Sequence, residues 1–412
     1  MMYTQNDKRV AVVGGGAAGL FATAILLARG VKVTLFEHKP RMGTKLMITG
    51  KGRCNVTNNC TPREVLENVV TNPRFLYSAL YALTPQDVMA FFEERGVPLK
   101  TERGGRVFPV SDHSLDIVEC LRKAVRGATI IKEKVTALLT NDEGELVGLR
   151  THQEYHFDAV LLATGGVSYP QTGSDGSGYA LAYGVGHTIV TPTPSLVPLT
   201  SDDDICQRMQ GLSLKNVGLK VKLGDKKIYE DFGEMLFTHF GVSGPMILSA
   251  SARLKGLDVS GVVIEIDLKP ALDEKTLDAR LLSDFSKNAN RDFINELAQL
   301  LPQKMLLPFA ERVGINPHKK VHDITREERR RILQMLKAFT IQISDFRPIE
   351  EAIITSGGIS TKEIDPKTME SKLVRSLYFA GEVMDVDAYT GGFNLQIAFS
   401  TAYLAAEAMA EL

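Results

Sequence analysis

The strongest pattern of hydrophobic positions lies at the beginning of the chain. The run KRVAVV (8–13) is short, apolar and β-branched, which is typical of a buried strand in a parallel sheet. A glycine-rich turn follows, and the apolar residues of 17–29 predict a helix that stops at Gly30. The next apolar run, VKVTLFE, predicts a second strand that ends at Glu37. Strand, turn, helix and strand in this order predict an α/β unit.

The turn GGGAAG carries the chemistry of this unit. Gly14, Gly16 and Gly19 fit G-x-G-x-x-G, in which the glycines allow a tight turn, a close approach to a pyrophosphate and close packing of helix on strand. The helix N-terminus directs free amides at phosphates. Glu37 stands where a carboxylate accepts hydrogen bonds from ribose hydroxyls. The unit is predicted to bind a dinucleotide, and this motif alone does not separate FAD from NAD. The residues expected at the cofactor from this unit are Gly14, Gly16, Ala17, Ala18, Gly19, Glu37, His38 and Lys39.

Two distant stretches favour FAD. DAVLLATGG (158–166) is an apolar strand that ends in Thr164, Gly165 and Gly166, and 377–396 reads as a strand, an acidic loop and a glycine pair before a helix to Leu412. This arrangement resembles flavoproteins with two dinucleotide-binding domains, whose last helix points its N-terminus at the flavin pyrimidine. A helix N-terminus stabilises the negative charge of a reduced flavin.

The same resemblance assigns roles within the C-terminal stretch. The amides would come from Asn394, Leu395 and Gln396. Gly381 would approach the pyrophosphate and ribityl chain beside an acid. Most such flavoproteins carry Asp after this glycine, whereas this chain has Glu382, so the ribityl contact is expected to be longer or displaced onto Asp385.

The middle of the chain is expected to be an insert. A proline-rich link, VTPTPSLVPL, begins it. Strand-like alternation follows in LKVKL, KKIYED and GVVIEIDL, and three amphipathic stretches between 273 and 339 then predict helices. We therefore predict a doubly wound (Rossmann-like) FAD domain formed by 1–188 and 343–412. A β-rich insert (189–272) and a helical insert (273–342) interrupt it.

Composition and charge exclude several classes of protein. The 48 basic and 49 acidic residues nearly cancel, so no global field attracts nucleic acid or an anionic membrane. The polar N-terminus is unlike a signal peptide, and apolar runs are too short to span a membrane. A soluble cytoplasmic protein is the expectation. The run Arg329–Arg331 invites an RNA-binding interpretation, but neighbouring acids and an amphipathic pattern favour an ordinary surface helix.

The polar stretch TGKGRCNVTNNC (49–60) allows three interpretations: a redox-active cysteine pair, a metal site or a loop that contacts a ligand. Cys54 and Cys60 are separated by five residues, whereas the pair of disulfide-reducing flavoenzymes is separated by four. No matching Cys/His pair stands at metal-ligand spacing elsewhere. The loop interpretation is favoured, and Cys54 is expected to fill space rather than act as a nucleophile.

Motifs along nearly the whole chain resemble one bacterial flavoprotein family. They are GGGAAGL, TGKGRCN, ATGG with SYPQTGSDGSGY, FTHFGVSGP, TSGGI and AGEVMDVDAYTGGFNLQIA. The family is the BaiN/RdsA-like group, whose members are often described as aminoacetone oxidases or NAD(P)/FAD-dependent oxidoreductases. The resemblance implies that 49–60 is a flavin loop and that the insert forms a substrate domain. Its cofactor contacts would include Lys45, Gly52, Arg53, Cys54, Asn55 and Val135.

Lys51 and Arg53 are the candidate catalytic cations, because positive charge stabilises negative charge that develops on a flavin. An equally good alternative is that both only hold a phosphate or the loop itself. Tyr389 is a third catalytic candidate, by analogy. The insert offers Glu230, Glu234 and His239 as titratable groups, and a structural role fits His239 equally well.

The predicted function is an FAD-dependent oxidoreductase that transfers a hydride between a small organic substrate, such as an amine or amino ketone, and flavin N5. Reoxidation by O2 is favoured because no second G-x-G-x-x-G follows a strand to bind NAD(P)H. One alternative is an NAD(P)H-dependent reductase of a small-molecule acceptor, with NAD(P)H as a transient donor. An alternative from another class is an FAD-dependent RNA-modifying or RNA-binding protein. No metal, nucleic acid or membrane partner is expected.

Overall fold

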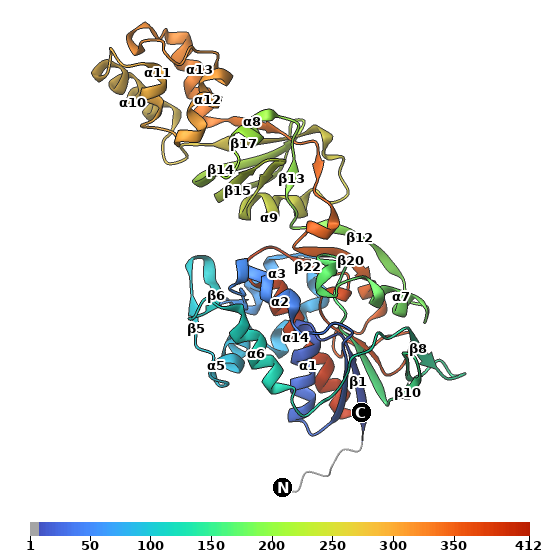
Figure 1. The fold of residues 1–412 in the computed structure, drawn as a ribbon. Helices are drawn as coiled ribbons and strands as arrows, with labels where there is room; N and C mark the ends of the chain where they lie inside the picture. Colours follow the sequence, from blue (N-terminus) through green and yellow to red (C-terminus); the bar gives the residue numbers. More distant parts are fainter. Residues whose placement is uncertain (1–7) are drawn as a thin grey trace. The chain divides into compact units, whose positions relative to one another are not determined.

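The computed structural model describes residues 8–412, which divide into two compact units (Figure 1). Unit 1 comprises residues 8–195 and 349–412, so both ends of the chain build it. Unit 2 comprises residues 196–348 and is inserted between the two halves of unit 1. Each unit has its own hydrophobic core.

A five-stranded parallel sheet forms the centre of unit 1. Its strands in spatial order are β21 (Leu377–Phe379), β11 (Ala159–Leu162), β1 (Arg9–Val13), β2 (Lys32–Phe36) and β7 (Thr129–Ile131). The central strand β1 is apolar because both of its faces are covered, and Val10, Ala11 and Val12 are fully buried. The predicted α/β fold with a parallel sheet is confirmed.

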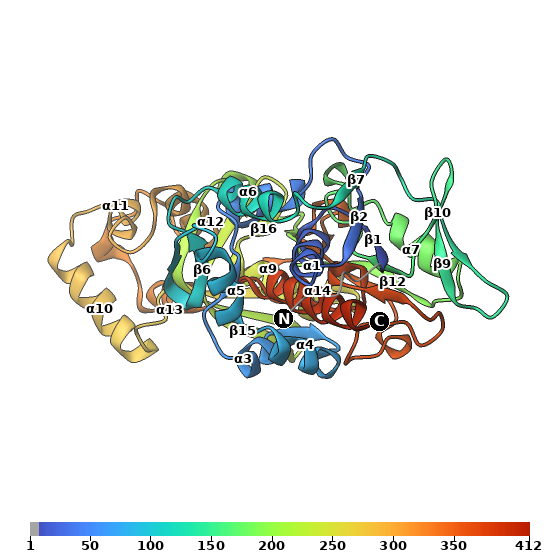
Figure 2. The same cartoon turned by 90° about the horizontal axis from the view of Figure 1, so that it is seen from below.

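Helices from the two ends of the chain pack side by side against each other. They are α1 (Ala17–Ala28) and α14 (Phe393–Glu411), which run together in both Figure 1 and Figure 2. The rings of Phe21 and Phe399 lie 5.0 Å apart between them. Arg29 and Glu407 form an ion pair of 2.8 Å at the outer end. The C-terminal helix is therefore part of the N-terminal nucleotide-binding unit.

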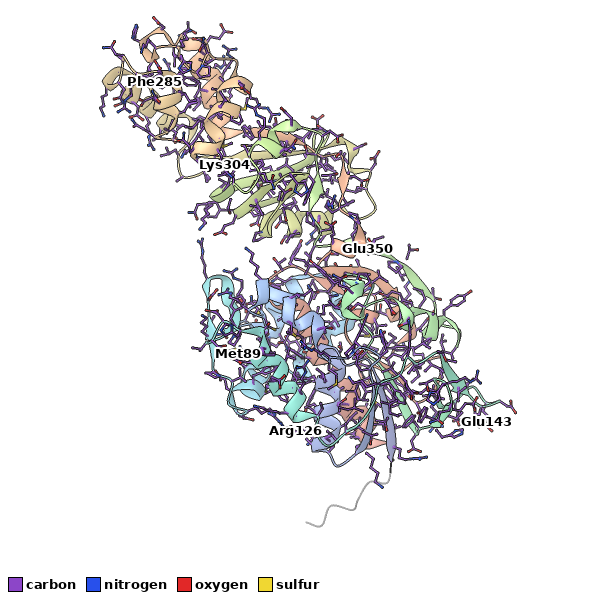
Figure 3. The ribbon with its side chains drawn as sticks, in the orientation of Figure 1. Met89, Arg126, Glu143, Phe285, Lys304 and Glu350 are labelled. Carbon is purple, nitrogen blue, oxygen red and sulfur yellow. The ribbon has the colours of Figure 1, made fainter. Side chains whose placement is uncertain are left out.

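Smaller elements surround this centre. A three-stranded antiparallel sheet lies beside it, and Glu143 marks the turn between its first two strands in Figure 3. Its strands are β8 (Ala137–Thr140), β9 (Leu146–Arg150) and β10 (Glu154–His156). The other strands of unit 1 are β3 (Thr57–Asn58), β4 (Val69–Thr71), β5 (Leu99–Thr101), β6 (Arg106–Pro109), β12 (Ile189–Ser195), β20 (Ile354–Ile359) and β22 (Asp387–Ala388). Its other helices are α2 (Thr44–Ile48), α3 (Pro62–Glu67), α4 (Tyr77–Ala82), α5 (Pro85–Glu93), α6 (Ser114–Ala124) and α7 (Ser177–Tyr183).

Unit 2 is built on a seven-stranded antiparallel sheet. In spatial order the strands are β18 (Phe339–Gln342), β17 (Val262–Asp267), β14 (Ser213–Leu223), β15 (Lys226–Thr238), β16 (Gly241–Ser243), β13 (Leu199–Thr200) and β19 (Asp345–Phe346). Its helices are α8 (Asp204–Arg208), α9 (Pro245–Arg253), α10 (Glu274–Lys287), α11 (Phe293–Leu297), α12 (Leu306–Val313) and α13 (Arg326–Lys337). Helices α10 to α13 lie between β17 and β18 in the chain; Phe285 on α10 and Lys304 before α12 mark this helical part in Figure 3.

The unit boundaries differ by a few residues from the expected ones. Strand β12 begins at Ile189 but pairs with β20, so the first boundary follows Ser195. The second boundary follows Pro348, because β19 still pairs with β13 inside unit 2. The helical part is not a separate C-terminal piece of the insert, since β18 returns to the sheet after α13. Within residues 8–412, no helix combines the length and the hydropathy that a membrane crossing requires.

A buried histidine joins two loops of unit 1. His187 Nδ1 lies 3.2 Å from Glu363 Oε2, and its Nε2 lies 2.8 Å from Ser371 Oγ. A carboxylate only accepts hydrogen bonds, so Nδ1 is the donor and Nε2 accepts from the serine hydroxyl of a neutral imidazole. Burial lowers the pKa of His187, and the neighbouring Glu363 opposes this shift.

We expect the free energy of unfolding to fall between about pH 7.5 and about pH 5.5 partly through His187, because the unfolded imidazole protonates near pH 6.5 while the folded one resists the proton. The stabilisation is thus present above the unfolded pKa and is lost as the pH falls towards the lower, folded pKa. His187→Gln cannot titrate and should lose less stability over the same interval. Urea denaturation of both proteins measures the difference; equal losses would contradict this origin.

Candidate functional site

Three glycines shape the turn between β1 and α1. Gly14 and Gly19 are needed for close packing, and Gly16 leaves open space. Gly14 has a φ of +106°, and a Cβ there would press on the carbonyl of Ala163. A Cβ on Gly19 would overlap the carbonyl oxygen of Gly14. A Cβ on Gly16 would meet no atom within 4 Å. The first glycine therefore lets the turn pack against the end of β11, the third lets α1 pack against the turn, and the second keeps space free.

That space belongs to a cavity inside unit 1. Gly14, Gly16, Ala17 and Ala18 line it, so the N-terminus of α1 opens into it. Gly16 is the N-cap and supplies no side-chain cap, and no acidic residue stands in the first turn. The first amides of a helix have no intrahelical acceptor and attract anions. This end of α1 can bind a phosphate group.

Glu37 closes the same turn from the end of β2. Its carboxylate accepts the N–H of Gly15 at 2.9 Å and the N–H of Lys39 at 2.7 Å, and it lines the cavity together with His38 and Val135. A carboxylate has about four lone-pair positions, so two remain for ribose hydroxyls. Lys39 and Gly19 do not line the cavity. Gly19 acts through helix packing, as its crowded Cβ position indicates.

The loops after β11 and β21 supply the opposite wall. Thr164 and Gly165 line the cavity, and the buried Thr164 Oγ1 has no hydrogen-bond partner among residues 8–412. Gly381 has a φ of +75°, and a Cβ added to it would lie only 3.0 Å from the Cβ of Ala18. Glu382 lines the cavity and pairs with Lys45 at 2.7 Å. Gly166 does not line it, because it packs against Thr355 instead.

The N-terminus of α14 also reaches the cavity. Asn394 and Leu395 line it, whereas Gln396 does not. The Asn394 side chain is occupied by the backbone N–H and carbonyl of Ala388, at 2.9 and 2.8 Å. The Gln396 side chain is buried and binds Thr57 and the Leu83 carbonyl, so it anchors the helix. The polar side chains of Asn394 and Gln396 are therefore both occupied within the fold.

Most of the predicted flavin loop lies outside this cavity. Thr49 lines it, but Lys51, Gly52, Arg53, Cys54 and Asn55 do not. The short helical turn Thr49–Gly52 contains a kink at Gly50 and Lys51, both with positive φ. Lys51 is exposed, and the catalytic role proposed for it stays a prediction. The buried Asn55 Oδ1 has no hydrogen-bond partner among residues 8–412, so a contact with a ligand also stays a prediction.

Arg53 is held by its own part of the fold. Its guanidinium donates two hydrogen bonds to Glu102, at 2.8 and 2.9 Å, and one to Asp112 at 3.0 Å. It also lies 3.9 Å above the ring of Phe108. All three partners belong to the β5–β6 region, and the hydrogen bond with Glu102 raises the pKa of Arg53. This placement differs from a cation facing a cofactor and matches the alternative that Arg53 holds the loop.

Cys54 is placed as a space-filling residue. It is fully buried with a φ of +60°, and burial raises the pKa of its thiol to about 12. Burial likewise raises the pKa of Cys60 to about 11, and both cysteines are free. A reactive cysteine needs a lowered pKa, so this environment opposes redox chemistry at the pair.

Two further candidates, Tyr389 and Asp385, do not line the cavity. Tyr389 is half-buried and its N–H donates to the Asn68 carbonyl at 3.0 Å. Asp385 accepts from the side chain of Asn72 and from the N–H of Gly357, so its carboxylate holds the loop around β20. The catalytic role of Tyr389 stays a prediction. We expected a cofactor contact to move from Glu382 onto Asp385, but Glu382 lines the cavity and Asp385 does not.

The titratable residues named in the insert belong to unit 2. Glu230 pairs with Lys227 at 2.5 Å on the surface of the sheet. Glu234 and His239 are exposed, and the His239 ring packs edge-on against Phe240 at 5.0 Å. Each stands outside the cavity of unit 1.

Several cavity residues were missed from the sequence. Lys134, Ser174, Ser177, Ile353 and Ile354 line it. Ser174 and Ser177 lie inside the SYPQTGSDGSGY motif, which resembles other flavoproteins and could have indicated them. The isoleucines directly precede TSGGI, but nothing in their identity distinguishes them from core residues.

The residues present fit FAD. A helix N-terminus for phosphate, a carboxylate for ribose and a second helix N-terminus line one cavity. A dinucleotide that carries a flavin would use all three features, whereas a mononucleotide would leave one helix end unused.

Comparison with known proteins decides the family. The family model described as "HI0933-like protein Rossmann domain" matches residues 8–408. The chain belongs to this family. The HI0933-like proteins are FAD-dependent oxidoreductases of the BaiN/RdsA-like kind, so the resemblance inferred from the motifs is confirmed.

Two relatives match this HI0933-like protein over nearly its whole length. The "3-dehydro-bile acid delta(4,6)-reductase" of Clostridium scindens is 30% identical, and the match covers 98% of this chain and 99% of that protein. The "ribosomal RNA dihydrouridine synthase" of Haemophilus influenzae is 31% identical over 96% of each. Among solved structures, a 3-ketosteroid delta1-dehydrogenase from Sterolibacterium denitrificans has 12% identity and a TM-score of 0.50, covering 98% of this chain and 100% of that one. This last likeness concerns the fold alone.

Gly16 and Gly19 make a matched pair for testing the cavity. We expect Gly19→Ala to destabilise the protein by about 3 kcal/mol or more, because its methyl group would overlap the Gly14 carbonyl. Gly16→Ala should change stability by less than about 1 kcal/mol, yet weaken FAD binding by about tenfold. Thermal denaturation of the apoprotein and FAD titration separate the two effects. Unchanged FAD affinity in Gly16→Ala would contradict the placement of the cofactor.

Arg53 and Lys51 make a second matched pair in one loop. Arg53→Met should cost about 1 kcal/mol of stability, because its carboxylate partners are partly exposed, and should leave FAD affinity within about twofold. Lys51→Met removes the same charge from an exposed position and should leave the melting temperature unchanged. A large loss of FAD affinity in Arg53→Met alone would overturn the structural role assigned to it.

Proposed function

We propose that this protein is an FAD-dependent reductase of a carbon–carbon double bond conjugated to a carbonyl group. The observation that carries the proposal is the cavity of unit 1, with two helix N-termini and the Glu37 carboxylate arranged for a flavin dinucleotide. The reaction class is supported by the names of two relatives that match over nearly the full length. A delta(4,6)-reductase of a 3-keto bile acid and a dihydrouridine synthase each saturate a double bond next to a carbonyl.

The residues of the cavity would bind and orient the cofactor. Phosphate groups would meet the amides at the start of α1, and Glu37 would accept hydrogen bonds from ribose hydroxyls. The first turn of α14 directs its amides at the cavity, where they stabilise negative charge. When bound, FAD supplies a centre that accepts and donates hydride.

The reductive direction differs from the O2-dependent oxidation favoured by the sequence. That preference rested on the lack of a second nucleotide-binding motif, and some flavoenzymes use NAD(P)H without one. The names of the relatives, at 30% and 31% identity over nearly the whole chain, weigh more because they describe two reductions of one chemical type. A small-molecule enone is the first candidate substrate, since the net charge of −1 gives RNA no general attraction.

A uridine in RNA is the second candidate substrate. It is favoured by a specific observation, the 31% identity to the ribosomal RNA dihydrouridine synthase of Haemophilus influenzae across 96% of both chains. A uracil ring offers the same conjugated double bond as an enone. The two substrates therefore differ in recognition rather than in the reaction.

The test follows the flavin band of the FAD-loaded protein under anaerobic conditions. We expect NADPH or NADH to bleach the band, and a 3-keto-4,6-diene steroid or a uridine-containing ribosomal RNA to restore it without O2. The saturated ketone of the same steroid is the matched control and should leave the flavin reduced. A flavin that neither nucleotide reduces, but that an amine reduces with release of peroxide in air, would replace the reductase with an oxidase.

A further inference from the structure

The carboxylate of Glu382 is bound by three separate segments of unit 1. Its Oε2 accepts a hydrogen bond from Lys45 Nζ at 2.7 Å. Its Oε1 accepts from Ser168 Oγ at 3.0 Å and from the backbone N–H of Thr355 at 2.9 Å. The side chain is only 15% exposed, so these contacts are shielded from water. The carboxylate is fixed in position before any ligand binds.

Lys45 completes a closed arrangement with the same residues. Its ammonium donates to Glu382 and also to Ser168 Oγ at 2.7 Å, and its side chain is 21% exposed. Ser168 is fully buried and thus bridges the two charged groups. Both Lys45 and Glu382 line the cavity, so a cation and an anion stand side by side on its wall.

The length of the glutamate makes this pair possible. An aspartate on the same backbone would end about 1.5 Å short, so it could not hold Lys45 and the Thr355 amide together. The length of the Glu382 side chain therefore suits its partner, Lys45, which lies 337 positions earlier in the chain.

We propose that Lys45 and Glu382 act as one neutral ion pair in which each charge offsets the effect of the other on the balance between oxidised and reduced cofactor in this cavity. The proposal rests on the assignment of the cavity to FAD. A cation at the wall stabilises negative charge that arises on reduction, and a carboxylate at the wall opposes it. Neither residue is catalytic: the pair positions two opposed charges, and Ser168 and Thr355 keep them in place.

The pairing predicts opposite effects for the two single substitutions. Lys45→Met leaves the carboxylate alone and should favour oxidised FAD by about tenfold, which lowers the midpoint potential by about 30 mV for a two-electron couple. Glu382→Gln leaves the ammonium alone and should raise the potential by a similar amount. The double variant Lys45→Met/Glu382→Gln is neutral again and should return close to the wild-type value. Dye-coupled spectroscopic titration of the FAD-loaded proteins measures all four potentials.

Two controls separate charge from structural damage. Glu382→Asp keeps the charge and should shift the potential less than Glu382→Gln. Lys134→Met removes another cation of the cavity wall, one that pairs with Asp175 at 2.7 Å near the Glu37 end. It should weaken FAD binding without moving the potential. Loss of packing alone would move both single variants of the pair in the same direction.

The outcomes distinguish this inference from the proposed function. Opposite shifts that cancel in the double variant support the ion pair. Shifts of the same sign, or none, in protein that binds FAD would overturn the inference and leave the reductase proposal standing. Wild-type protein that binds no FAD would overturn both.

Discussion

The return of the C-terminal segment to the N-terminal sheet is the constraint on which the rest of the structure depends. Strand β21 pairs in parallel with β11, and β11 pairs with β1, so residues beyond the insert complete the sheet begun at residue 9. Helix α14 then packs on α1 through Phe21 and Phe399. Gly381 fits between Ala18 and Ala398 because it has no side chain. This closure brings two helix N-termini, from opposite ends of the chain, to one cavity.

The charges around the cavity form a consistent arrangement for a flavin. The two helix ends contribute partial positive charge, which suits phosphates at α1 and a reduced ring at α14. Two cations of its wall have carboxylate partners: Lys45 pairs with Glu382, which also lines the cavity, and Lys134 pairs with Asp175. The opposite charges of such a pair largely cancel each other at a distance.

The sequence predicted the features that depend on neighbouring residues. The glycine turn, Glu37 and the start of α14 follow from local patterns of glycine, apolar runs and strand ends, and the structure places them at the cavity. Roles that depend on distant partners could not be predicted. Arg53 donates hydrogen bonds to Glu102, and Gln396 accepts one from Thr57. No local sequence pattern predicts either contact. The same holds for the pairing of Lys45 with Glu382, although each was expected at the cofactor separately.

The most direct test of the central claim is to identify what the folded protein carries. Protein purified in the presence of excess FAD and freed of unbound ligand is denatured, and the released compound is identified and quantified by chromatography. The account predicts one FAD per chain, with adenine and flavin parts both intact. Release of FMN alone, or of no flavin at all from well-folded protein, would contradict a cavity built for the whole dinucleotide.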